Sequence, residues 1–151
     1  MFGAGRDLPL TSTDIDRLIE ALRSLHKESY IEKIAVLEAL KNYGEFNFLD
    51  GETGIKVDFW ILQKSPFDVS RLQRRVAKKI LNSNVYFISP EDLIISKLLW
   101  YKKSRSSRHL EDIESIFTIS GSLLDMSYVK KWAKNLGIEK FLKNFFGETK
   151  L

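Results

Sequence analysis

The sequence predicts an α+β fold in which a small β-sheet from the middle of the chain packs with several helices. Three patterns predict this class. Apolar residues recur at helical spacing up to residue 42, alternate with polar residues over residues 46–62, and return to helical spacing after residue 89. The expected sheet is mixed or antiparallel. It consists of a hairpin at 46–62 and a short strand at 85–88, and a helical C-terminal half follows it.

Helices are expected wherever apolar residues recur every three or four positions between a cap residue and a stop residue. The clearest start is the run Ser89-Pro90-Glu91-Asp92. Ser89 suits the N-cap, Pro90 suits the first helical position, and Asp92 lies where a capping box requires an acid. The expected helices span residues 11–25, 32–42, 65–80, 89–103, 108–119, 126–136 and 139–146.

The β-hairpin is predicted by alternation between apolar and polar residues. Phe46 and Phe48 alternate with polar neighbours, a turn-rich run occupies residues 50–54, and residues 55–62 alternate again. Asp58 lies on the second strand between two apolar residues, so its side chain is expected on the opposite face from theirs.

Composition restricts the class of protein. The chain has 151 residues, which suits a single domain (1–151) with a sheet-containing part (1–88) and a helical part (89–151). It has no cysteine, which excludes disulfides, thiolate zinc sites and a cysteine nucleophile. It has no apolar run long enough to cross a bilayer and no signal-peptide pattern, so no membrane partner and a cytoplasmic location are expected. The net charge of +4 is compatible with a nucleotide or nucleic-acid partner.

Four segments in a fixed order resemble a known family. They are Phe46-Asn47, the strand TGIKVDFWIL from Thr53 to Leu62, the segment SPEDLIISKLLWYKKSRSSRHLEDI from Ser89 to Ile113, and the tail from Leu124 to Leu142. Together they resemble the nucleotidyltransferase superfamily, in particular the minimal nucleotidyltransferases and abortive-infection toxins of bacteria and archaea. The resemblance covers about two-thirds of the chain. It implies a polymerase-β-like fold and transfer of a nucleotide from an NTP to an acceptor.

The resemblance also implies roles for individual residues. Asp58 matches the third of three carboxylates that bind two divalent metals such as Mg²⁺, which makes it the candidate metal ligand and a candidate catalytic residue. Lys97 matches a lysine that contacts phosphate and is the second candidate catalytic residue. Together with Arg108 and Asp112 it forms the candidate nucleotide-binding set. Lys97 and Asp112 fit two interpretations equally well: a phosphate-contacting lysine oriented by an acid, or a salt bridge that only joins two helices.

The carboxylate pair that the family places before Asp58 has two candidate positions. Asp14 and Asp16 have the right spacing, but they chelate one metal together only on a strand, and this segment predicts a helix. Both aspartates are therefore expected at the start of that helix, near its positive end. In the register that Asp7-Leu8-Pro9-Leu10 suggests, the pair falls on Gly3-Ala4-Gly5. The front catalytic segment is then expected to be missing.

The preferred interpretation is a nucleotidyltransferase-fold protein that is catalytically incomplete as written and binds a nucleotide or a partner. Mg²⁺ and NTP are its expected cofactors only if it is active. One alternative is an active metal-dependent nucleotidyltransferase that uses Asp14, Asp16 and Asp58. The other is a non-catalytic interaction module with a partner protein, for example in a toxin–antitoxin-like pair. A sheet without its leading strand would expose an unpaired edge, so a homo-oligomer is also expected.

Overall fold

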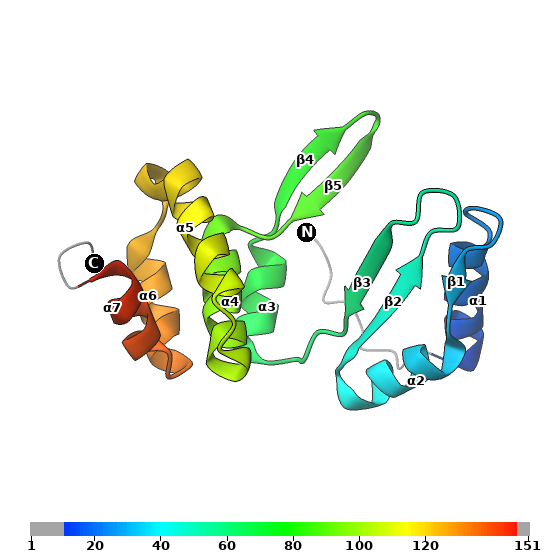
Figure 1. Cartoon of the computed structure of the whole chain (residues 1–151), viewed down its shortest axis with the longest axis horizontal. Helices are drawn as coiled ribbons and strands as arrows, with labels where there is room; N and C mark the ends of the chain where they lie inside the picture. The colour runs from blue at the N-terminus through cyan, green and yellow to red at the C-terminus, as the bar shows by residue number, and fades with distance from the viewer. Residues whose placement is uncertain (1–10, 148–151) are drawn as a thin grey trace. The chain divides into compact units, whose positions relative to one another are not determined.

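A computed structural model describes residues 11–147. The fold is α+β, with seven α-helices and two small antiparallel sheets in the described part and a helical C-terminal half (Figure 1). The chain divides between Gln63 and Lys64 into two compact units. The expectation of a single domain with a sheet-containing part (1–88) and a helical part (89–151) stays a prediction.

The N-terminal unit contains two helices and a three-stranded sheet in the order β1-β2-β3. The expected hairpin at 46–62 is confirmed, because β2 and β3 pair antiparallel with Asn47 opposite Asp58. The short strand β1 was not predicted from the sequence. The elements of this unit are α1 (Ser12–Arg23), β1 (Tyr30–Ile31), α2 (Lys33–Asn42), β2 (Glu45–Leu49) and β3 (Lys56–Trp60).

One face of this sheet forms the core of the N-terminal unit. Phe46 and Phe48 are buried with residues of α1 and α2, and the ring of Phe46 stacks on Phe59 at a centroid distance of 4.9 Å. Asn47 and Asp58 alternate with these phenylalanines and lie on the other face.

The C-terminal unit contains the remaining helices and a second sheet, a hairpin of β4 and β5. The helices predicted from residue 89 onward are confirmed to within a few residues, and Ser89 caps α4 by accepting a hydrogen bond from the Asp92 N–H at 3.2 Å. The elements are α3 (Pro66–Gln73), β4 (Val76–Ile80), β5 (Ser83–Phe87), α4 (Pro90–Ser104), α5 (Arg108–Ser120), the 3₁₀ helix η1 (Gly121–Leu123), α6 (Met126–Asn135) and α7 (Glu139–Phe146).

Two predictions for this region were wrong. The helix expected over 65–80 ends at Gln73, and its second half is strand β4. The strand expected at 85–88 is β5, which pairs with β4 and not with the 46–62 hairpin, so one common sheet does not form. Residues 81 and 82 form a two-residue connection with Leu81 at φ 52°, and this tight turn allows the chain to pair directly with itself.

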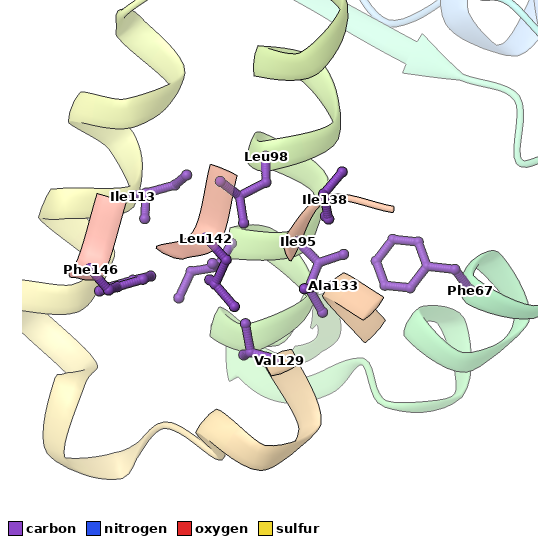
Figure 2. Close-up of a cluster of buried hydrophobic side chains, with 10 residues drawn as sticks. Phe67, Ile95, Leu98, Ile113, Val129, Ala133, Ile138, Leu142 and Phe146 are labelled. Carbon is purple, nitrogen blue, oxygen red and sulfur yellow. The ribbon is translucent and has the colours of Figure 1, made fainter. Parts of the chain in front are cut away.

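The core of the C-terminal unit lies between its helices. Side chains from α3, α4, α5, α6 and α7 converge on one buried cluster, as Figure 2 shows. Within the described residues, no helix has both the length and the hydropathy needed to cross a membrane. The buried members of the cluster are Phe67, Ile94, Ile95, Leu98, Ile113, Val129, Ala133, Ile138, Leu142 and Phe146.

Candidate functional site

Lys97 and Asp112 lie at the rim of the helical core, where α4 runs beside α5. Leu98 and Ile113, the residues that follow them, are fully buried, and this packing sets the rotation of both helices. The ammonium of Lys97 donates a hydrogen bond to Asp112 Oδ2 at 2.6 Å. The structure therefore brings together two of the three residues proposed for nucleotide binding.

Arg108 lies one helical turn before Asp112 on α5, so both side chains belong to the same face of that helix. It is the first residue of α5 and it is exposed. Lys97 pairs with this carboxylate and Arg108 lies one turn away along α5, so the three side chains have a net charge of +1.

The surroundings of Lys97 are aromatic and partly shielded from water. Its side chain is 20% exposed, and its Nζ lies 5.1 Å from the centroid of the Trp100 ring. Trp100 also packs against the ring of His109, whose Nδ1 is buried without a hydrogen-bond partner among the described residues. An ammonium group has three donors and Asp112 accepts one of them, so Lys97 can still donate to a phosphate oxygen.

Two other cations near the end of α4, Lys102 and Arg105, have contacts of their own. Lys102 donates to the carbonyl of Gly137 at 3.3 Å, and the guanidinium of Arg105 lies 4.8 Å from the Phe141 ring centroid. These contacts hold the end of α4 against the last two helices. Lys102 and Arg105 are therefore poorer candidates for a ligand than Lys97 and Arg108.

Asp58 lies in the N-terminal unit, on the face of the sheet opposite the buried phenylalanines. Its carboxylate pairs with Lys56 of the same strand at 3.0 Å, and both side chains are about half exposed. The candidate metal ligand is thus neutralised by a neighbouring lysine. Asp58 thus belongs to a different compact unit from Lys97.

Asp14 and Asp16 lie on helix α1, so the prediction of a helix for this segment is confirmed. Asp14 completes a capping box: its carboxylate accepts from the Thr11 N–H at 2.9 Å, while the Asp14 N–H donates to the Thr11 hydroxyl at 3.2 Å. The hydrogen bonds from Thr11 hold the pKa of Asp14 below its ordinary value. Asp16 pairs with Lys33 of α2.

These positions do not fit the two-metal site of the active alternative. Helix α1 packs on the phenylalanine face of the sheet, whereas Asp58 lies on the other face. Within residues 11–147, no three acidic or histidine side chains gather where they could hold a metal ion. The other suggested position of the pair, Gly3-Ala4-Gly5, lies outside the described residues.

A buried ionic network joins α3, α4 and α6, and sequence analysis did not find it. Asp92 is fully buried and accepts from the Tyr128 hydroxyl at 2.7 Å and from the Ser89 hydroxyl at 2.8 Å. Arg74 lies beside it, with Nε 3.4 Å from Asp92 Oδ2 and its guanidinium 3.9 Å from the Tyr128 ring centroid. Glu91 accepts from Arg74 at 3.2 Å. The only sequence signal for this network was the capping box at Ser89, and it predicted only that Asp92 helps to cap the helix that starts there.

The electrostatics of this network favour a structural role. Burial and the hydrogen bond to Asp92 raise the pKa of the Tyr128 hydroxyl, so Tyr128 remains a donor at neutral pH. Burial alone would raise the pKa of Glu91, but the N–H of Asp125 and the charge of Arg74 hold it below its ordinary value. The network thus fixes the start of α4 and thereby the position of Lys97 two turns further along the same helix.

Comparisons of the chain with protein-family models, with curated proteins and with solved structures found no match. The ion pair between Lys97 of α4 and Asp112 of α5 is therefore the main guide to the function of this chain.

Proposed function

We propose that this protein has a nucleotidyltransferase-like fold and binds a nucleotide, with Lys97 and Arg108 contacting its phosphates and Asp112 orienting Lys97. The observation that supports this most is the 2.6 Å ion pair between Lys97 and Asp112, with Arg108 one turn away on the same helix face. The three side chains together carry a net positive charge, and Lys97 has donors left over, which suits a phosphate group.

We propose further that the protein is incomplete as a catalyst. Nucleotide transfer by two metals needs several carboxylate oxygens at one place. Asp14 and Asp16 are engaged by the helix cap and by Lys33, and Asp58 is paired with Lys56. With one such carboxylate, Mg²⁺ should bind in the millimolar range or more weakly.

The same ion pair also supports a rival function. A salt bridge between neighbouring helices can be purely structural, and the chain would then be an interaction module without a nucleotide site. The two functions differ in what Lys97 contacts when a nucleotide is present.

Calorimetric titration with ATP, in the presence and absence of Mg²⁺, distinguishes them. Lys97→Met keeps the length of the side chain but removes its charge, and we expect it to weaken ATP binding about 10- to 150-fold, the worth of a hydrogen bond to a charged group. Lys103→Met changes an exposed lysine of the same helix and should leave the affinity unchanged. If the wild-type protein does not bind ATP, or if both variants bind it equally well, the proposal is wrong.

A further inference from the structure

The β4–β5 hairpin is exposed along its whole length. Every residue from Arg75 to Ile88 is exposed, and among the described residues neither hydrophobic cluster includes a side chain from it. In Figure 1 the hairpin extends away from the helices of the C-terminal unit. Such a hairpin adds little to the stability of its own unit, and its exposed surface is free to contact another molecule.

The charged side chains of this segment are all positive. Residues 74–89 contain four cations and no acidic residue. Arg74 is occupied by the buried network; Arg75, Lys78 and Lys79 are exposed, and Arg75 also donates to the carbonyl of Leu72 at 2.6 Å. The hairpin is therefore complementary to a polyanion.

The register places an aromatic and a basic group together on one face. Partners across the ladder share a face, so Tyr86 lies with Ala77, and Asn84 lies with Lys79. The guanidinium of Arg75 lies 4.7 Å from the Tyr86 ring centroid, which places Arg75 on this face as well. Ala77 is too small to cover the ring of Tyr86, which is 55% exposed. We call this surface, formed by Arg75, Lys79, Asn84 and Tyr86, the ribbon face.

We propose that the ribbon face binds single-stranded nucleic acid. A base stacks on the Tyr86 ring or on the guanidinium plane of Arg75, and Lys79 contacts the backbone phosphates. Aromatic rings beside cations bind single strands without regard to sequence, because every base has a face that can stack. This inference is independent of the nucleotide site at Lys97.

The opposite face of the hairpin carries mostly apolar side chains: Val76 and Phe87 are paired across the ladder, Val85 and Ile80 lie further along, and Lys78 lies opposite Val85. A nucleic acid on the ribbon face does not need this surface. Substitutions on the ribbon face and on the opposite face can therefore be tested separately.

Fluorescence anisotropy with a labelled oligodeoxythymidylate tests the proposal on the full chain at several NaCl concentrations. Lys79→Gln should weaken binding and reduce the slope of log K against log[salt] by about 0.7, which is the contribution of one phosphate contact on a single strand. Tyr86→Leu should weaken binding about tenfold with a nearly unchanged slope, because it removes stacking and no charge.

Matched controls separate this surface from net charge and from the Lys97 site. Lys131→Gln makes the same charge change at an exposed position of α6 and should leave the slope unchanged. Lys97→Met should bind the oligonucleotide like the wild type, and the hairpin variants should keep any ATP binding. Circular dichroism confirms that each variant is folded. Equal losses in the Lys79 and Lys131 variants, no loss in Tyr86→Leu, or equally tight binding of the same sequence as a duplex would overturn the proposal.

Discussion

Replacing Tyr128 by phenylalanine removes a single oxygen atom from the buried network and retains the ring that packs against Arg74. The lost hydroxyl donates to Asp92 at 2.7 Å and shares a hydrogen bond of 3.0 Å with Ser70. Asp92 has no exposed surface, so water cannot replace the missing donor in the folded protein. A hydrogen bond to a charged group contributes about 1.5–3 kcal/mol, and we expect Tyr128→Phe to lower the free energy of unfolding by about this amount.

Urea denaturation followed by far-UV circular dichroism measures this loss, because the network lies in the helical C-terminal unit. With a slope of about 2 kcal/mol/M, the midpoint should fall by roughly 1 M. Tyr86→Phe is the matched control: it removes the hydroxyl of an exposed tyrosine and should change the stability by less than about 0.5 kcal/mol. If both variants have the same midpoint, the hydrogen bond from the Tyr128 hydroxyl to Asp92 does not stabilise the folded protein.

Three further predictions concern the N-terminal unit. Gly51→Ala should destabilise the protein by about 1–3 kcal/mol in urea denaturation, because a Cβ there would lie 2.2 Å from the carbonyl oxygen of Lys27. The hydrogen bond to Asp50 raises the pKa of His26 above its ordinary value of 6.5 in the folded protein. The stability that protonated His26 contributes is therefore complete below pH 6.5 and is lost as the pH rises through the raised pKa. His26→Gln removes this effect and should reduce the fall in melting temperature between about pH 6 and pH 8. Asp14→Asn/Asp16→Asn should lower the melting temperature slightly and leave ATP binding unchanged, because these carboxylates cap and anchor α1.

Each of these predictions has a contrary result. Gly44→Ala is the control for Gly51, since a Cβ there meets nothing closer than 3.8 Å, and equal losses at the two glycines would remove the steric argument. An unchanged pH dependence in His26→Gln would show that its pair with Asp50 does not form in solution. Loss of ATP binding in the double aspartate variant would favour the active, metal-dependent alternative.

Local signals in the sequence predicted most helices correctly. Ser89 and Pro90 begin α4, and Asp125 caps α6 by accepting a hydrogen bond from the Tyr128 N–H. Such caps involve residues only three positions apart, so they can be recognised without knowledge of the fold.

The second hairpin and the buried network could not be predicted in the same way. The cations of residues 74–79 suit a helix face, and only pairing with residues beyond the turn at Leu81 makes this segment a strand. Tyr128 contacts Asp92 across 36 positions of sequence. The ion pair of Lys97 with Asp112 was foreseen from the family resemblance, whereas spacing alone would not have joined two residues on different helices.

The most direct test of the proposed nucleotide site is an NMR titration of the ¹⁵N-labelled protein with ATP. If Lys97 and Arg108 bind the phosphates, the largest amide shifts should lie in α4 around Lys97 and in the first turns of α5, and Lys97→Met should abolish them. Shifts confined to the strand around Asp58, and seen only with Mg²⁺, would contradict the account and indicate a metal-dependent site in the N-terminal unit.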